Sequence, residues 1–155
     1  MGKGPPALPK IVNRRVRYDF DLLETVEAGI ALTGSEVKSL RAGRASLDGS
    51  YGFIRNGELY LLDCNISPYP MAGYAQHKPT RERKLLLHRR QIRRWHAKVT
   101  ERGLTIVPLA IYFNERGLAK VEIALARGKS HADKRETIKR RDQQRDIDQA
   151  MRRRR

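Results

Sequence analysis

The sequence has a single cysteine, Cys64, among its 155 residues. One thiol excludes a disulfide framework and a thiolate zinc site, and it is compatible with a reducing cytoplasm. No stretch approaches the roughly 20 apolar residues that a membrane-spanning helix needs. The first ten residues contain three prolines and lack the apolar segment of a signal peptide. We therefore expect a cytoplasmic protein with no membrane partner.

The sequence also lacks the residue groupings of a catalytic centre. The four histidines show no metal-ligand spacing. Arg127-Gly128-Lys129-Ser130 resembles the end of a P-loop, but Ile123 stands where that loop needs a glycine. A metal-dependent nuclease is the remaining enzymatic alternative, and its carboxylates would have to come from hairpin and turn positions such as Asp48, Glu58 and Asp63. We therefore expect no enzymatic activity, no catalytic residue, no metal and no cofactor.

Acidic residues are few relative to basic ones. Lys and Arg number 33 against 17 Asp and Glu, which gives a net charge of +16 and a pI near 10.6. Self-repulsion on this scale destabilises a compact chain, so a polyanionic partner is expected. A basic surface that serves only solubility is the alternative. The apolar fraction of 39% is enough for one small core.

The first regular pattern is an alternation of apolar and polar residues over 20–32. This pattern predicts a long strand, bent near Gly29, with Glu27 on its polar face. Residues 33–36, Thr-Gly-Ser-Glu, fit a capping box, so a short helix over 35–40 should follow.

The middle of the chain carries a hairpin signal. Two β-rich runs, 51–55 and 58–62, flank Asn56-Gly57, a dipeptide typical of two-residue hairpin turns. Residues 67–80 contain three prolines and no apolar period, which predicts a long loop.

Beyond this loop the sequence predicts one helix and two strands. Apolar residues recur at helical spacing over 84–102, and Gly103 occupies the position of a C-terminal cap. A continuous apolar run over 104–113 predicts a buried strand. A turn at 114–117 then leads to an alternating strand over 120–125.

Together these elements predict a mainly β fold. About five strands in hairpins with one or two inserted helices describe an OB-like closed antiparallel barrel. We expect a flexible N-terminal arm over 1–12, the barrel over 13–126 and a basic tail over 127–155. The tail holds twelve Arg or Lys against five Asp or Glu and few apolar residues, so it should be disordered until it binds a partner.

Basic residues and tyrosines indicate the class of the partner. Cations gather after the first long strand, around the predicted long helix and in the tail, and Tyr51, Tyr69 and Tyr74 lie near them in sequence. Tyrosine rings can stack on unpaired bases while cations neutralise phosphates. Three separate basic clusters favour a large, shaped RNA over a single groove-bound strand.

Several sequence blocks carry a resemblance to a known family. The blocks are Asn13-Arg14-Arg15, Glu27-Ala28-Gly29-Ile30, Gly34-Ser35-Glu36-Val37-Lys38-Ser39-Leu40-Arg41, Arg83-Lys84-Leu85-Leu86-Leu87-His88 and Asp133-Lys134-Arg135. They stand in the same order as in the small protein B family, the bacterial SsrA-binding proteins that partner transfer-messenger RNA (tmRNA). The resemblance covers about residues 13–141. It implies an OB-fold core and a role in trans-translation, in which tmRNA is carried into stalled ribosomes.

The resemblance also assigns roles to individual residues. It implies that Glu27, Leu86 and Lys120 contact the tRNA-like domain of tmRNA, although burial in the barrel is the competing interpretation for Leu86. It implies that Asp133-Lys134-Arg135 acts in the ribosome. The family usually has His or Tyr directly before this motif, whereas this chain has Ala132 preceded by His131. Either His131 supplies the ring from a shifted position, or the contact is absent.

The combined prediction is an RNA-binding protein, expected to be monomeric, whose partners are tmRNA and the decoding region of the small ribosomal subunit. A structural ribosomal protein is the alternative. The residues predicted to bind RNA are Asn13, Glu27, Glu36, Lys38, Arg41, Arg44, Tyr51, Arg83, Lys84, Leu86 and Lys120. The tail residues predicted to act in the decoding region are Lys129, His131, Asp133, Lys134, Arg135, Lys139 and Arg140.

Overall fold

The fold comes from a computed structural model that describes residues 8–129 and 131–153, with the backbone alone for 131–134, 136–137 and 153. The strands are β1 Ile11–Val12, β2 Phe20–Ile30, β3 Ala45–Ser46, β4 Tyr51–Arg55, β5 Glu58–Leu62, β6 Asn65–Ile66, β7 Arg83–Leu86, β8 Thr105–Phe113 and β9 Ala119–Gly128. The helices are α1 Val16–Asp19, α2 Gly34–Arg41, the 3₁₀ turn η1 Gly73–Ala75, α3 Arg89–Arg102 and α4 His131–Arg153.

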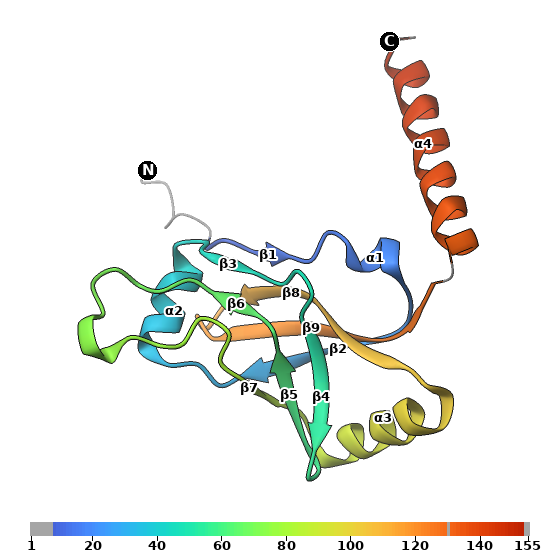
Figure 1. Cartoon of the computed structure of the whole chain (residues 1–155). Helices are drawn as coiled ribbons and strands as arrows, with labels where there is room; N and C mark the ends of the chain where they lie inside the picture. The colour runs from blue at the N-terminus through green and yellow to red at the C-terminus, as the bar shows by residue number, and fades with distance from the viewer. Residues whose placement is uncertain (1–7, 130, 154–155) are drawn as a thin grey trace.

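The main sheet closes into a ring (Figure 1). Its strands follow the order β1-β8-β4-β5-β7-β2-β9, and a further pairing of β8 with β9 closes a ring from β8 to β9, with β1 paired to β8 outside the ring. All the pairings are antiparallel. The strands β3 and β6 form a separate two-stranded sheet. The predicted OB-like closed antiparallel barrel is therefore confirmed.

The ring closes at Gly52. The seam between β4 and β8 has one paired position, Gly52 opposite Ile106. A Cβ atom at position 52 would lie 2.6 Å from Cγ2 of Ile106, so the two strands can approach this closely only where one of them lacks a side chain. A glycine inside a strand often marks such a close backbone approach.

The inward side chains of the ring form the core. Leu59, Leu61, Leu85, Ile123 and Leu125 are buried there, as the alternating patterns of their strands require. The helix α3 covers this core with Ile92 and Trp95. Gly103 ends α3 with a φ of 63°, the left-handed conformation that a C-terminal cap needs.

The predicted helix over 84–102 is wrong in its first turn. Residues 83–86 form β7, and the helix begins at Arg89. Leu85 pairs with Leu59 of β5, and Arg83 and Leu85 are buried while Lys84 and Leu86 are exposed. Such a two-residue alternation belongs to a strand, and pairing on both edges of β7 outweighs the local helical spacing.

Other elements follow local signals in the sequence. The hairpin β4–β5 turns at Asn56-Gly57 as predicted, with both residues at positive φ. The helix α2 begins with the predicted capping box between Thr33 and Glu36. The strand β2 ends at Ile30, and its irregularity lies between Leu22 and Glu24 rather than near Gly29.

The two ends of the chain differ from the predicted boundaries. Ile11–Val12, expected in the flexible arm, pairs with β8 as β1, and residues 1–7 lie outside the described residues. At the other end β9 extends the barrel to Gly128. The tail forms α4, which leaves the barrel beside α1 (Figure 1).

The helix α4 has little apolar support. Its side chains Ile147 and Met151 are exposed, and Glu136 and Asp148 precede Arg140 and Arg152 by one helical turn. That this helix forms only on a partner stays a prediction. No helix within residues 8–129 and 131–153 is long and apolar enough to cross a membrane.

Replacing Gly52 by alanine should destabilise the barrel, because the added methyl group overpacks the seam against Ile106. We expect the free energy of unfolding to fall by about 1–3 kcal/mol in chemical denaturation. Gly34→Ala is the matched control, since a Cβ there meets nothing within 4 Å and alanine favours a helix. Equal stability of the two variants would contradict the steric account of closure.

Candidate nucleic-acid interface

The outer face of β7, β2 and β9 brings together three residues that are distant in the sequence. Gly29 of β2 is paired with Leu86 on one side and with Lys120 on the other. Paired positions on neighbouring strands lie on the same face of a sheet, and Glu27 precedes Gly29 by two residues on that face. Glu27, Leu86 and Lys120 therefore share one surface, which we call the outer sheet face.

Leu86 is a surface residue. Its side chain is 53% exposed, so the expectation of burial in the barrel is wrong. It lies against Gly29, where a Cβ atom would come within 3.2 Å of the Leu86 Cβ. The glycine lets this exposed leucine lie flat against the sheet, where an apolar contact can be offered to a partner.

A tyrosine holds the carboxylate of the outer sheet face. The Tyr112 hydroxyl donates a hydrogen bond to Glu27, and Tyr112 is paired with Lys120 across β8 and β9. Partial burial and this hydrogen bond raise the pKa of Tyr112 to about 12, so the hydroxyl stays protonated. The Lys10 ammonium lies 5.7 Å from the centre of the Tyr112 ring. Glu27 is thus oriented from within the face and remains exposed.

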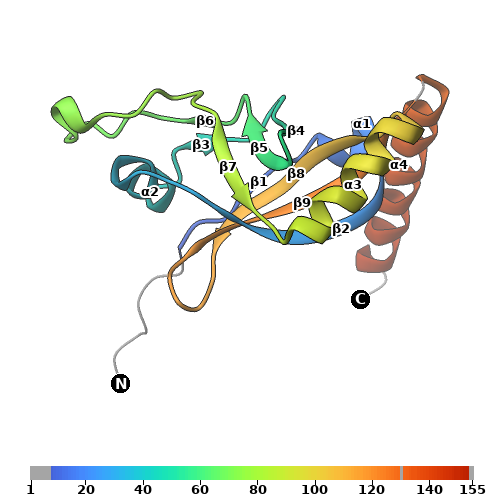
Figure 2. The ribbon, with the colours of Figure 1, turned by 90° about the horizontal axis from the view of Figure 1, so that it is seen from below.

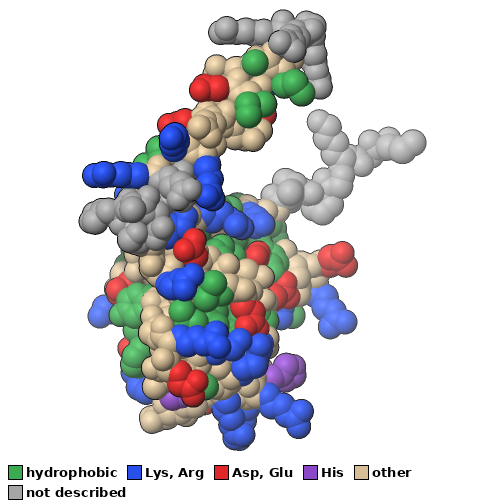
Figure 3. Space-filling model, turned by 90° about the vertical axis from the view of Figure 1, so that its right-hand side faces the viewer, with side chains coloured by type: hydrophobic (Ala, Val, Ile, Leu, Met, Phe, Trp, Pro, Cys, Tyr) green, Lys and Arg blue, Asp and Glu red, His purple; other side chains and the backbone are tan. Residues whose placement is uncertain are grey.

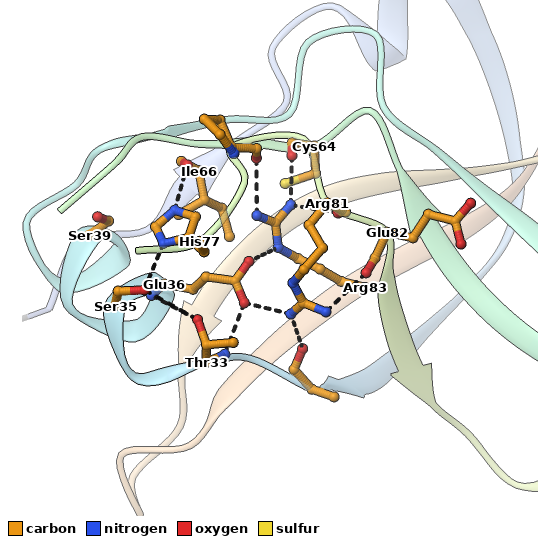
Figure 4. Close-up of polar contacts among 12 residues, drawn as sticks. Thr33, Ser35, Glu36, Ser39, Cys64, Ile66, His77, Arg81, Glu82 and Arg83 are labelled. Atoms are coloured by element: carbon orange, nitrogen blue, oxygen red, sulfur yellow. Dashed lines mark hydrogen bonds and ion pairs between the residues drawn. The ribbon is translucent and has the colours of Figure 1, made fainter. Parts of the chain in front are cut away.

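A buried ion-pair network lies under the neighbouring end of the barrel (Figure 4). Glu36 of α2 accepts hydrogen bonds from Arg83 of β7 and from Arg81, the latter at 2.6 Å. The side chains of Glu36 and Arg83 are both fully buried. Arg83 also donates to the carbonyl oxygens of Cys64 at 2.7 Å and Pro79 at 3.0 Å. Its guanidinium therefore connects α2 to β7, to the residues after β5 and to the end of the 67–80 loop.

The pKa of Glu36 reflects two opposing effects. Burial favours the neutral acid, but hydrogen bonds from Arg81 and the Thr33 backbone, together with the charge of Arg83, favour the carboxylate more strongly. The pKa of Glu36 therefore lies below its ordinary value. The network is an ion pair at neutral pH.

Three of the predicted RNA-binding residues are corrected by these positions. Glu36 and Arg83 have no exposed side-chain surface, so they position other groups and have nothing to offer RNA directly. Asn13 is also buried, and its side-chain amide donates to the carbonyl oxygen of Pro108 at 3.1 Å. All three were assigned to RNA because they stand in the sequence blocks that carry the family resemblance, and Arg83 also because it lies in a basic cluster.

The remaining residues of the barrel that were predicted to bind RNA lie on the surface, but they do not form one patch. Lys38, Arg41 and Arg44 are exposed on and just after α2. Lys84 lies on β7 and pairs with Glu58 at 2.9 Å. Tyr51 lies on β4, beside a groove lined by Asn13, Arg15, Asp19 and Val107.

Part of the basic cluster predicted around the long helix is held in ion pairs. Arg81 and Arg83 belong to the buried network, whereas Arg94 and Lys98 of α3 pair with Glu24 of β2. Burial opposes ionisation of Glu24, but hydrogen bonds from α3 outweigh it and lower its pKa. Lys and Arg side chains lie on both the barrel and the lower part of α4 in Figure 3.

The tail residues are placed on or next to α4. Lys129 precedes the helix and donates to the Arg17 carbonyl at 3.1 Å. Arg135, Lys139 and Arg140 are exposed on the helix. His131, Asp133 and Lys134 lie in its first turns, and their side chains are outside the described atoms.

Comparison with known proteins identifies the family. The sequence matches the family described as "SmpB protein" over residues 10–153. The chain belongs to the SmpB family. The SsrA-binding protein of Moorella thermoacetica is 58% identical over 142 residues, covering 92% of each chain. That of Myxococcus xanthus is 56% identical, covering 92% of this chain and 87% of the relative.

A solved structure shares the SmpB fold. It is described as "tmRNA-SmpB: a journey to the center of the bacterial ribosome" and is 53% identical, with a TM-score of 0.67. The match covers 84% of this chain and 94% of that chain. The resemblance to the SmpB family predicted from five sequence blocks is therefore confirmed.

The sequence did not reveal two polar residues that shape the surfaces of this SmpB family member. Tyr112 lies within an apolar run that predicts a buried strand, and only its pairing with Lys120 shows that its ring faces outward. His77 lies in a loop without metal-ligand spacing, yet it is buried and its ring bonds Ser35 and the Ile66 carbonyl, each at 2.8 Å. Neither residue carries a local signal of its role.

Glu36→Gln should destabilise the protein at neutral pH, because it leaves the buried Arg83 without a counter-charge. We expect a loss of about 3–5 kcal/mol in the free energy of unfolding. Because folding lowers the pKa of Glu36, its contribution is complete above the ordinary value of 4.5 and is lost as pH falls through the folded pKa. The difference between the two proteins should therefore shrink in acid.

Urea unfolding of both proteins at pH 7 and below pH 4 measures this difference. The control is Glu58→Gln, which breaks the exposed pair with Lys84 and should change stability little. A Glu36→Gln protein as stable as the control at pH 7 would contradict the role of the network.

Proposed function

We propose that this chain binds the tRNA-like domain of tmRNA and delivers it to stalled ribosomes for trans-translation. Its relatives are named SsrA-binding proteins, and the similar solved structure is described as tmRNA–SmpB in the bacterial ribosome. The observation that carries the proposal is the meeting of Glu27, Leu86 and Lys120 around Gly29 on one exposed face. These are the residues that the family resemblance assigned to the tRNA-like domain.

The outer sheet face offers three different contacts to RNA. The Glu27 carboxylate can accept hydrogen bonds from base amino groups or ribose hydroxyls, and its bond from Tyr112 fixes its direction. The Lys120 ammonium can neutralise a phosphate. Leu86 supplies an apolar surface for a ribose or an unstacked base. Such a mixture recognises a folded RNA by its shape rather than by phosphate charge alone.

The proposed activity is binding and delivery in the cytoplasm, by a monomer without enzymatic chemistry. RNA recognition requires placed donors, acceptors and cations, and the outer sheet face supplies all three. Lys38, Arg41, Arg44, Tyr51 and Lys84 add exposed cations and a ring elsewhere on the barrel. We propose that they extend RNA contact beyond the outer sheet face.

We propose a second role for the tail, in the decoding region of the small ribosomal subunit. The helix α4 leaves the barrel beside α1 and does not cover the outer sheet face (Figure 1). Its Asp133-Lys134-Arg135 segment matches the family motif, and Lys129, His131, Lys139 and Arg140 flank that segment. With Ala132 before the motif, His131 is the candidate ring for this site.

Leu86→Glu should weaken binding of the isolated tRNA-like domain by at least about tenfold, or about 1.4 kcal/mol, because it places a carboxylate against RNA. The matched control is Leu23→Glu, which makes the same change at a residue of similar exposure, 50% against 53%, in the same strand β2. Leu23 lies six residues before Gly29, about 20 Å along the strand. Equal losses in both variants, measured by direct titration, would refute recognition at the outer sheet face.

Replacing Asp133, Lys134 and Arg135 by alanine should abolish peptide tagging on stalled ribosomes while tmRNA still binds. Replacing Arg152 to Arg155 should weaken mainly non-specific attraction. The four arginines carry more charge than the motif, whose net charge is a single positive, so the order of the two effects separates specific contact from charge. Full tagging activity in the motif variant would refute the proposed role of the tail.

A further inference from the structure

The loop between β6 and β7 projects from the barrel and carries exposed apolar side chains at its tip. In Figures 1 and 2 this green segment, residues 67–80, extends past α2 at the end of the molecule opposite α3. Tyr74 is fully exposed, with a relative exposure of 105%, and Met71 is 85% exposed. Neither side chain contributes burial to the core.

The conformation of this loop is fixed by its own polar contacts. The Gln76 side chain accepts from the Tyr69 amide at 2.9 Å and donates to the Tyr69 carbonyl at 2.7 Å, which closes the tip. His77 anchors the base of the loop between Ser35 of α2 and the Ile66 carbonyl (Figure 4). The tip is therefore held in position before any partner arrives, so binding there costs little ordering entropy.

The loop is attached to a cationic surface. No Asp or Glu occurs from Cys64 to Arg81, and the one carboxylate of α2, Glu36, is buried in the ion-pair network. Lys38, Arg44 and Lys78 are exposed around this loop. Among the described residues none of these three cations is in an ion pair.

A groove runs from Lys38 of α2 to Met71 and its neighbours in the loop. It has a volume of about 460 Å³ and is lined by Thr33, Gly34, Ser35, Lys38, Tyr69, Met71, Ala72 and Ala75. The Lys38 ammonium lies 5.4 Å from the centre of the Tyr69 ring. The half-buried Tyr69 ring lies beside Lys38, the Tyr74 ring is exposed at the tip, and no carboxylate lines the groove, so this surface complements a polyanion with flat apolar groups. Unpaired nucleotides of RNA have this chemistry.

We propose that the tip of loop 67–80 is a second RNA-contact surface, on which the Tyr74 ring stacks against an unpaired base. Lys38, Arg44 and Lys78 would neutralise the adjoining phosphates, and Met71 would contact the neighbouring ribose or base. The proposal rests on the proposed function in taking RNA as the partner. The surface is built from a loop and α2, so it can be altered without touching Glu27, Leu86 or Lys120.

Three substitutions of Tyr74 in the full-length protein test the stacking. Tyr74→Ala removes the ring, Tyr74→Phe keeps it without the hydroxyl, and Tyr74→Leu keeps an apolar side chain without a ring. Stacking of one base is worth about 5- to 150-fold in affinity, the equivalent of about 1–3 kcal/mol at 1.4 kcal/mol per factor of ten. We expect Ala and Leu to weaken binding by at least fivefold and Phe to leave it within about twofold.

Two binding measurements distinguish whether the stacked base belongs to tmRNA or to ribosomal RNA. One titrates the isolated tRNA-like domain of tmRNA, and the other titrates vacant ribosomes. Loss in the first assay assigns the unpaired base to tmRNA, and loss in the second assigns it to ribosomal RNA. Thermal unfolding of each variant should match the unsubstituted protein, because position 74 is fully exposed.

Two results would overturn the proposal. The first is Tyr74→Ala binding within twofold of the unsubstituted protein in both assays. The second is retention of affinity by Tyr74→Leu where Tyr74→Ala loses it, which would indicate that an apolar side chain suffices and that no ring stacks on a base. Failure of the proposed function looks different, because the unsubstituted protein would then not bind the tRNA-like domain and Leu86→Glu would have no effect.

Discussion

The ion pair between Glu36 and Arg83 is the interaction on which the arrangement of the surfaces depends. Placing two charges in a protein interior is unfavourable unless their hydrogen-bonding capacity is filled. Here the Glu36 carboxylate receives two guanidinium groups and the Thr33 amide, while Arg83 also reaches the carbonyl oxygens of Cys64 and Pro79. One buried pair thus fixes α2, the end of the 67–80 loop and the start of β7 relative to one another, and β7 carries Leu86.

Local signals in the sequence predicted the parts of the fold that depend on interactions between residues close in the chain. The capping box at Thr33 and the Asn56-Gly57 turn each require specific residues at fixed spacing, and both are present as predicted. The segment around Leu85 satisfies both helical and strand periods, so only its pairing with β5 and β2 decides between them. The two-residue strands β1, β3 and β6 are too short to leave any period in the sequence.

The residues of the outer sheet face were predicted from the family resemblance and not from local patterns. Nothing in spacing or composition relates Glu27, Leu86 and Lys120, which the family resemblance supplied and the strand register then brought together. The assignment of Asn13, Glu36 and Arg83 to RNA came from the same resemblance blocks, which do not distinguish a buried residue from one that contacts a partner. Their burial follows from specific partners, and partners distant in the sequence cannot be recognised without the fold.

The position of Gly29 between β7 and β9 has a consequence for when the outer sheet face exists. Its three residues belong to three strands that are not consecutive in the chain, so no isolated hairpin of this chain can display them together. A ligand of this face therefore selects the native state over the unfolded ensemble. By mass action, a ligand at a hundred times its dissociation constant adds about 2.7 kcal/mol to native-state stability. The partner of such a surface also acts as a stabiliser of the barrel, and resistance to proteolysis becomes a measure of its occupancy.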